Sequence, residues 1–293
     1  MTLTILNADD YAMTDGVSRS IEALAHTRRL SATSVMSTMP EWPEAAHRLR
    51  VYRGSLAIGL HLNLTLGAPL GPMPQLAPGG MFPSLHGLML QALPGRLDAS
   101  EVRAEIGRQL DTFERHLGFP PDHVDGHQHV QVLPGIRGAL LDALAGRYPL
   151  RRPLVRDPSD AIDQLAARGL AGAKALTVKA LSAGFARAAN ARGLPTNARF
   201  AGFSAFDTAS SYAAEVAAEL DRGDGRGHGC AIVMCHPGYA DAALAALDPV
   251  VERRQQEHDG LMQLAALPER IWHAKRAMDG AAIDWRGAMG AGA

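Results

Sequence analysis

Acidic and histidine side chains follow short apolar runs at several distant points of the chain. Asp9 and Asp10 come after the run Leu3–Leu6, and His61 and His127 stand at the ends of two later runs. One carboxylate and two imidazoles can hold a divalent metal ion and leave positions open for water or substrate, which is typical of catalytic metal sites. We therefore predict one divalent metal ion bound by Asp10, His61 and His127.

Three further side chains are expected to move or orient protons at this site. Asp9 could take a proton from a water molecule whose pKa the metal lowers towards about 7. Because successive strand residues point to opposite sides, Asp9 and Asp10 can both face one site only if the chain leaves extended geometry there. His236, in a Cys-His-Pro-Gly sequence, is expected to protonate a leaving group. Arg156 is expected to orient Asp9 by a charge-assisted hydrogen bond.

A second set of residues is predicted to bind substrate. Asp125, His127 and His129 are spaced so that they would share one face of an extended strand. We expect His129 to bind substrate, and either His129 or Asp125 to orient the metal ligands. Asp125 is also a candidate substrate contact, and Tyr11 and Trp42 are candidate stacking platforms for a sugar face.

Each of these residues also has an ordinary structural explanation. Paired aspartates after a strand often cap a helix or form a turn, and single histidines are usually hydrogen-bonded structural residues. His-Pro-Gly is also a turn sequence. Independent caps and turns give no reason for all these groups to gather on one predicted rim, which favours the metal site. The sequence has no Gly-x-Ser-x-Gly elbow, no phosphate-binding loop and no Gly-x-Gly-x-x-Gly after a predicted strand.

Short apolar runs alternate with helical patterns along the whole chain, which indicates βα units. The carboxyl ends of parallel strands share one face, so the residues above can converge there. Seven strands suit a barrel or a doubly wound sheet. The predicted strands are Leu3–Leu6, Ala32–Met36, Leu56–His61, His123–His127, Leu154–Arg156, Ala198–Phe203 and Ala231–Cys235.

Apolar residues recur at helical spacing over Glu101–Leu117, with Ser100 as the expected N-cap and Gly118 as the stop. The Gly- and Pro-rich stretch Leu66–Leu85 is expected to be a loop insertion, either a lid or a plain loop. We predict one domain over residues 1–286 and a disordered tail at 287–293. Further predicted helices are Asp15–Arg29, Leu140–Arg147, Ser211–Leu220, Pro249–Leu264 and a helical hairpin over Ile162–Arg192.

The composition excludes several classes of protein. Of the 293 residues, 47% are hydrophobic and 20% are charged, so the chain can bury a sizeable core. With a formal charge of −1, the sequence lacks the excess of basic residues that is typical of proteins that bind nucleic acid. No apolar stretch approaches the length of about 20 residues that spans a bilayer. The N-terminus lacks the pattern of a secretory signal. We expect a cytoplasmic protein in which Cys230 and Cys235, on opposite strand faces, form no disulfide.

Four motifs together resemble those of the YdjC/ChbG-like carbohydrate deacetylases. They are Asn7-Ala8-Asp9-Asp10-Tyr11, Gly59-Leu60-His61-Leu62, Asp125-Gly126-His127-Gln128-His129 and Cys235-His236-Pro237-Gly238. The motifs appear in the family's order. The resemblance implies a distorted (β/α) barrel similar to a TIM barrel, often dimeric, that binds Mg²⁺ or Zn²⁺ and removes acetyl groups from N-acetylated sugars such as chitooligosaccharides.

Carried over by motif, the resemblance implies that Asp9 is the general base, that Asp10, His61 and His127 bind the metal, and that His236 is the acid. Gln131 departs from the family pattern, in which we expect a further histidine, and this difference bears on substrate contacts. The expected substrate is a mono- or disaccharide unit or the glucosamine head group of a glycoconjugate. Alternatives are another metal hydrolase, such as a phosphoesterase or amidohydrolase, a non-haem iron oxygenase, or a non-catalytic sugar-binding protein.

Overall fold

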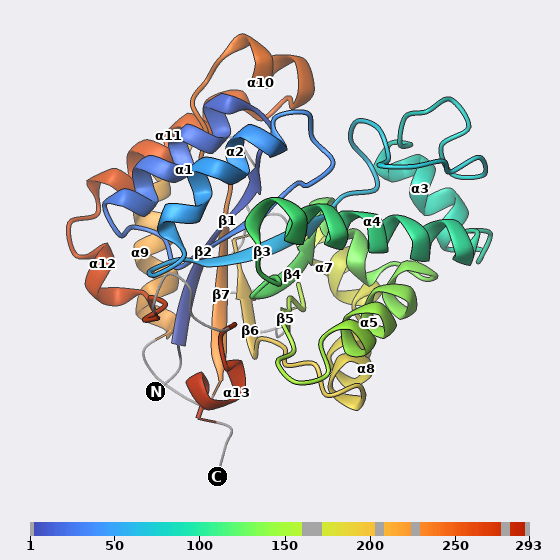
Figure 1. The fold of residues 1–293 in the computed structure, drawn as a ribbon. Helices are drawn as coiled ribbons and strands as arrows, with labels where there is room; N and C mark the ends of the chain where they lie inside the picture. Colours follow the sequence, from blue (N-terminus) through green and yellow to red (C-terminus); the bar gives the residue numbers. More distant parts are fainter. Residues whose placement is uncertain (1–2, 160–171, 203–207, 224–228, 277–281, 291–293) are drawn as a thin grey trace.

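All seven strands expected from the sequence are present, and they pair in parallel in a single sheet (Figure 1). The structure is a computed structural model that describes residues 3–159, 172–202, 208–223, 229–276 and 282–290. The order of the strands in the sheet is β5-β4-β3-β2-β1-β7-β6. The strands are β1 Leu3–Tyr11, β2 Ala32–Val35, β3 Ala57–Leu62, β4 His123–Gly126, β5 Leu154–Val155, β6 Arg199–Ala201 and β7 Cys230–Cys235.

The sheet curls until its two edges approach each other. Val155 of β5 forms an isolated parallel bridge with Thr196, which precedes β6, and its N–H donates to the Pro195 carbonyl over 2.8 Å. Strands such as β7 are buried along their whole length, as expected for a parallel sheet covered on both faces. The architecture is therefore an α/β single domain with a distorted, TIM-like barrel, as predicted.

Helices cover the outside of the sheet, with α1, α9 and α11 beside β1 and β7 and α4 and α5 at the other side (Figure 1). The hairpin predicted over Ile162–Arg192 contains α7 and α8, and its residues 162–171 lie outside the described residues. The helices are α1 Asp15–His26, α2 Trp42–Leu49, α3 Leu85–Ala92, α4 Ala99–Leu117, α5 Ile136–Arg147, α7 Gly172–Leu181, α8 Phe185–Ala191, α9 Tyr212–Gly223, α10 Ala242–Leu247, α11 Val251–Gln263, α12 Leu267–Arg270 and α13 Trp285–Ala288, with short 3-10 helices at Arg50–Tyr52 (η1) and His127–Val132 (η2).

Helix α4 shows how local signals set the ends of an element. Its N-cap is Asp98 rather than the expected Ser100, and the Asp98 carboxylate accepts the N–H groups of Ser100 and Glu101. The helix therefore begins at Ala99, earlier than predicted, because the Asp98 side chain accepts two N–H groups of its first turn. Gly118 ends the helix in the left-handed conformation at φ 81°, as expected.

The loop insertion over Leu66–Leu85 is anchored to α4. Glu101 accepts the backbone N–H groups of Gln75 and Leu76, and Glu105 accepts that of Leu70. These contacts favour the plain loop over the lid. Helix α3, which begins at the end of this segment, borders the cavity described below.

Two apolar clusters lie on the two faces of the sheet. Cys230 belongs to the inner cluster and Cys235 to the outer one, and both are free, as their odd spacing predicted. Trp285 and Met289 pack into the inner cluster. The tail therefore differs from the expectation at 287–290, where α13 and the buried Met289 lie, while 291–293 fall outside the described residues.

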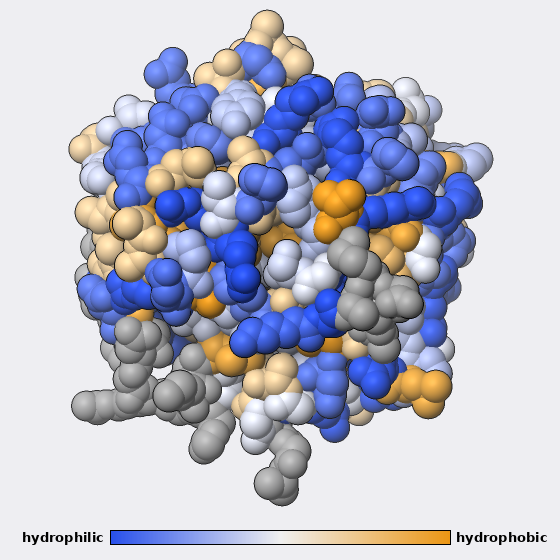
Figure 2. All heavy atoms as spheres, turned by 60° about the vertical axis from the view of Figure 1, so that its left-hand side comes forward, coloured by the Kyte–Doolittle hydropathy of each residue, from blue (hydrophilic) through white to orange (hydrophobic). Residues whose placement is uncertain are grey.

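The surface seen in Figure 2 is a mosaic of hydrophilic and hydrophobic side chains, with hydrophilic ones predominant. None of the helices in the described part of the chain combines the length and the hydropathy needed to cross a membrane.

Candidate active site

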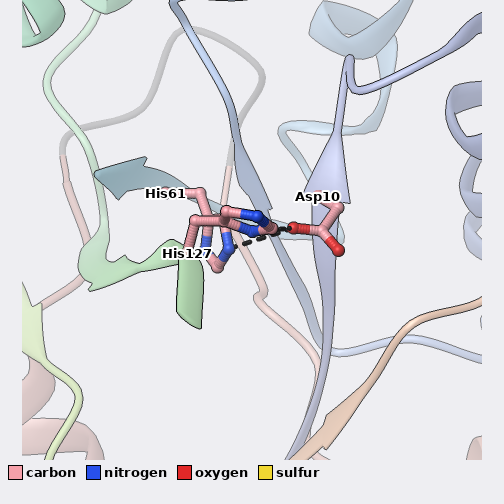
Figure 3. Close-up of side chains that lie close together, drawn as sticks. All are labelled: Asp10, His61 and His127. Atoms are coloured by element: carbon pink, nitrogen blue, oxygen red, sulfur yellow. Dashed lines mark hydrogen bonds and ion pairs between the residues drawn. The ribbon is translucent and has the colours of Figure 1, made fainter. Parts of the chain in front are cut away.

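Asp10, His61 and His127 meet at the carboxyl end of the sheet, where their side chains point toward one another (Figure 3). Asp10 Oδ1 lies 3.1 Å from His61 Nε2 and 3.0 Å from His127 Nδ1. The three side chains come from β1, β3 and the start of η2, so they are brought together only by the parallel sheet. One ligand atom from each lies within 4.8 Å of the others, which is the spacing of a group able to hold one metal ion.

A break in β1 directs both aspartates to the same side. Asp10 has φ 67° and Ala12 has φ 73°, and the pairing with β2 shifts register between Ala8 and Tyr11. Left-handed backbone is uncommon for residues other than glycine. It reverses the alternation that an extended strand would impose, so Asp9 and Asp10 both line one cavity. The departure from extended geometry that the sequence required is therefore present.

His61 is held from behind by a second carboxylate. Its Nδ1 lies 2.6 Å from Asp125 Oδ1 and 3.2 Å from Ser34 Oγ. An Nδ1–H that donates to Asp125 fixes the ring, so that Nε2 faces Asp10 as an N–H donor, or a metal ion with its lone pair once that proton has left. Burial alone would lower the pKa of His61, but Asp125 and Asp10 outweigh it and raise the pKa to about 10. A metal ion would therefore displace a proton from this ring.

Arg156 lies beneath the site and grips two carboxylates. Its Nη1 and Nη2 lie 2.6 Å from the two oxygens of Asp9, and Nη2 lies 2.5 Å from Asp125 Oδ2. Asn7 Nδ2 also donates to Asp9 over 2.7 Å. Burial opposes ionisation of Asp9, but the guanidinium outweighs it and holds the pKa well below its usual range. Asp9 is therefore ionised and held in one orientation. The charge-assisted hydrogen bonds expected between Arg156 and Asp9 are present.

Among the described residues, two groups of side chains have metal-ligand spacing, and they share His61. The second consists of Asp9, His61 and Asp125, but both of its carboxylates are already paired with Arg156. In the first group Asp10 keeps Oδ1 directed at the two imidazoles. The donor set of one carboxylate and two imidazoles therefore fits a divalent cation, and the first group offers the better site.

His236 follows β7 and completes the polar side of the cavity. Its Nε2 lies 3.9 Å from Asp9 Oδ2, and its backbone N–H donates to the buried Glu257 of α11. Burial lowers the pKa of His236 to about 4, more than Asp10 and Asp9 raise it. The imidazole is therefore neutral near pH 7 and must gain a proton before it can act as an acid.

Arg254 of α11 is part of the site, and sequence reasoning missed it. Its Nη2 lies 2.6 Å from Asp10 Oδ2 and 2.6 Å from Asp248 Oδ2. Its carbonyl accepts the N–H of Gly238, which ties α11 to the Cys-His-Pro-Gly segment. Burial would raise the pKa of Asp10, but Arg254 and then His127 hold it well below its usual range. The only signal in the sequence was an Arg-Arg pair in a predicted helix.

The predicted stacking roles of Tyr11 and Trp42 have to be corrected. Tyr11 is buried, and its hydroxyl donates to Glu22 and to the carbonyl of Ala45. Trp42 is buried in α2 and stacks on Phe113 of α4 at a ring distance of 6.1 Å. The turn after Asp10 and an unpredicted helix carry both rings away from the cavity, and neither lines it.

The shared strand face expected for Asp125, His127 and His129 is also wrong. Strand β4 ends at Gly126, and Gln128 and His129 adopt left-handed conformations at φ 53° and 60°. Asp125 is fully buried behind His61 and orients that ring, so its predicted contact with substrate is corrected. His129 does line the cavity, as its predicted role requires. Gln131 is buried and donates to the carbonyl of Arg156 over 3.3 Å.

The cavity beside the cluster has a volume of about 530 Å³. The polar groups of the cluster line it together with aliphatic side chains from α3, from α7, and from the end of η2 and the residue after it. Its lining residues are Asp9, Asp10, His61, Leu85, Met89, Gly126, His127, Gln128, His129, Val132, Leu133, Thr177, Val178, Leu181, Met234, His236, Asp248, Pro249, Val250 and Arg254.

The chain is therefore an α/β-barrel protein that gathers one carboxylate and two imidazoles at the carboxyl end of its strands, at a spacing that could hold a metal ion. Within that class, the model of the YdjC-like protein family matches residues 3–267. The chain belongs to this family.

Individual relatives agree with the family match. A chitooligosaccharide deacetylase of Serratia marcescens is 32% identical over 248 residues, which are 83% of this chain and 84% of that protein. The human carbohydrate deacetylase is 33% identical over 159 residues, which span 50% of this chain and about half (49%) of that protein. A crystal structure from Enterococcus faecalis V583, described as a candidate cellobiose-phosphate cleavage protein, is similar with a TM-score of 0.72 and 23% identity. The match covers 98% of this chain and 99% of that one, and it supports the fold.

Proposed function

We propose that this protein is a metal-dependent carbohydrate deacetylase that hydrolyses the N-acetyl group of an amino sugar and releases acetate. The observation that carries the proposal is the position of the ionised Asp9 in the same cavity as Asp10, His61 and His127. The names of the relatives from Serratia marcescens and human support the carbohydrate and the acetyl group.

The metal would be Mg²⁺ or Zn²⁺, held by Asp10 Oδ1, His61 Nε2 and His127 Nδ1. When bound, it would supply the Lewis acidity that polarises the amide carbonyl and makes water a better nucleophile near neutral pH. Asp125 fixes the ring of His61, and Arg254 holds the other oxygen of Asp10, so the chain presents the three donor atoms in one orientation.

Asp9 accepts a proton from the attacking water in this mechanism, while Arg156 keeps its carboxylate oriented. His236 is neutral at rest, and its Nε2 is 3.9 Å from Asp9 Oδ2. The proton removed from water therefore passes to His236, which delivers it to the sugar nitrogen as the C–N bond breaks. Water and amide are converted to acetate and an ammonium group on the sugar, because both water protons end on the nitrogen, so no further reactant is needed. His129 is a substrate contact on the cavity wall.

Acetate release from N-acetylglucosamine and its disaccharide tests the proposal. We expect purified protein to release acetate, to lose this activity with a chelator, and to regain it with Mg²⁺ or Zn²⁺. Asp10→Ala, His61→Ala and His127→Ala should lose bound metal and activity together. Phosphate release without acetate release would point to a phosphoesterase instead. Sugar binding without turnover by metal-loaded protein would contradict the enzymatic role.

A further inference from the structure

Much of the cavity lining is aliphatic. Leu85 and Met89 come from α3, and Val178 and Leu181 come from α7. Two more aliphatic side chains, Val132 and Leu133, come from the end of η2 and the residue after it. Among the described residues that line the cavity there is no tryptophan, tyrosine or phenylalanine. Aromatic rings are the usual platforms for a sugar face, so this wall offers a different kind of contact.

Polar partners for a second sugar are scarce on this wall. Thr177 is the one hydroxyl side chain among the described lining residues, and Gln128 is the one amide. A pyranose carries several hydroxyl groups, and each one that is buried without a partner costs about 1–3 kcal/mol. Burying hydrocarbon in the same surroundings is favourable, because each buried methylene contributes roughly 0.8 kcal/mol of transfer free energy. The wall therefore favours an alkyl chain over an extended oligosaccharide.

Helix α3 has the composition of a helix that meets apolar partners on more than one face. Its sequence is Leu-His-Gly-Leu-Met-Leu-Gln-Ala, in which Leu88 is buried in the protein core and Met89 borders the cavity. The long insertion that precedes α3 is fixed to α4 by the contacts of Glu101 and Glu105. Helix α3 is thus held in place, and its apolar face is a built part of the cavity.

We infer that the substrate is amphiphilic: an N-acylated amino sugar that places a hydrocarbon group against the wall made by α3, η2 and α7 while its amide faces Asp9 and Asp10. This inference rests on the proposed deacetylase function and names its substrate class. The hydrocarbon can be attached in two ways, as an aliphatic aglycone on the sugar or as a longer acyl chain on its nitrogen. The chemistry of recognition is the same for both.

Matched series of substrates test the inference with the metal-loaded protein. One series is the methyl, butyl and octyl glycosides of N-acetylglucosamine, each used below its micelle concentration. The other is glucosamine with N-acetyl, N-butanoyl and N-octanoyl groups. Release of the free amine is measured for all of them and for the N-acetylglucosamine disaccharide. We expect kcat/KM to rise about tenfold or more from the shortest to the longest member of one series, because several methylenes become buried.

Which series shows the rise tells where the hydrocarbon is attached. Flat kcat/KM in both series, or a disaccharide that exceeds every alkyl substrate, would overturn the inference while leaving the deacetylase proposal intact. No amine from any substrate, including the disaccharide, would instead count against the proposed function.

Two near-isosteric variants assign the preference to the wall. Met89→Gln and Val178→Thr add polar atoms to the cavity with little change of volume. Each should lower kcat/KM of the octyl or octanoyl substrate more than it lowers kcat/KM of the shortest substrate, so that most of the gain from the hydrocarbon is lost. Leu90→Gln is the matched control, because Leu90 is 61% exposed on α3 and does not line the cavity. An equal loss in Leu90→Gln would contradict the assignment to the cavity wall.

Discussion

The buried Arg156 and the partly buried Arg276 each pair with an aspartate, at opposite ends of the sheet, and the two pairs have different roles. At the carboxyl end, Arg156 meets both oxygens of Asp9 at 2.6 Å. At the amino end, Arg276 meets both oxygens of Asp122 at 2.5 Å. Asp9 also faces the cavity and lies 3.9 Å from His236, whereas Asp122 is enclosed and accepts the backbone N–H of Ile58.

The same ion-pair geometry therefore supports chemistry at one end and chain attachment at the other. The Asp122 carbonyl accepts the indole N–H of Trp285, so the amino-end pair ties the C-terminal segment to β4. Barrels of this kind commonly place function at the carboxyl face and stability at the amino face. A buried Arg–Asp pair therefore indicates a functional site only when one of its two side chains lines a cavity.

The largest effect is expected when the carboxyl-end pair loses its charge. Asp9→Asn should lower kcat by about 10²–10⁴, because the proton acceptor is lost. Bound metal should remain, since Asp9 is not one of the three proposed ligands. The fold should remain as well, because Arg156 keeps its contact to Asp125. Metal content and acetate release, measured on the same preparation, check this; full activity with metal retained would refute the role of Asp9 as the base.

The amino-end pair should show the opposite pattern. Asp122→Asn should lower the free energy of unfolding by about 3–5 kcal/mol, because it breaks a buried ion pair. The folded fraction should keep its kcat. Urea unfolding measures the change in the free energy of unfolding. The control is Asp142→Asn: the ion pair of Asp142 with Arg192 is exposed, so its loss should lower the free energy of unfolding by less than about 1 kcal/mol. Loss of turnover by folded Asp122→Asn would end the distinction between the two ends.

Arg254 forms a second arginine–aspartate pair at the carboxyl end, with the proposed metal ligand Asp10. Arg254→Met should lower metal affinity or activity by about 10–100-fold, because Asp10 loses the partner that orients its carboxylate. Asp248→Asn leaves the contact between Arg254 and Asp10 in place, so this variant should lose less metal affinity and less activity than Arg254→Met. Metal titration by calorimetry, with acetate release in parallel, compares the two variants. Wild-type affinity and activity in Arg254→Met would show that the contact is dispensable.

The last effect is a pH dependence and concerns Glu257, whose carboxylate accepts the backbone N–H of His236 and lies 3.6 Å from Arg253. Burial raises the pKa of Glu257 to about 7, and the N–H of His236, Arg253 and Arg254 lower it only in part, while Glu215 adds to the rise. A raised carboxyl pKa favours the folded state most below the ordinary pKa near 4.5. This advantage is lost as pH rises from about 4.5 through 7, by at most about 1.4 kcal/mol per pH unit. Glu257→Gln should remove this component of the slope in urea unfolding between pH 5 and 8; an unchanged slope would contradict it.

The strands could be predicted because parallel strands buried on both faces leave continuous apolar runs in the sequence. The same argument placed Asp10, His61 and His127 on one rim, since each follows such a run. Arg254 could not be found in this way, because it reaches Asp10 from 244 residues further along the chain and lies on a helix rather than at a strand end. The homodimer and the cytoplasmic location stay predictions.

The errors in the site have two physical causes. Between Asp125 and His129, sequence reasoning assumed extended backbone, whereas the chain turns left-handed at Gln128 and His129. A single such residue changes which side chains face the cavity. The second cause concerns Tyr11 and Trp42. Their rings are buried in the core, because burying an aromatic ring there is more favourable than exposing it at the cavity.

The left-handed backbone at Asp10 also limits how this enzyme can be made more heat-resistant. Relaxing such positions to glycine is an ordinary route to a more stable chain, and it is open at Arg28, which has φ 57° after α1. It is closed at Asp10, because glycine there would relieve the backbone and discard the carboxylate. Any programme of thermostabilisation would have to accept the conformational strain at the site and work on the rest of the barrel.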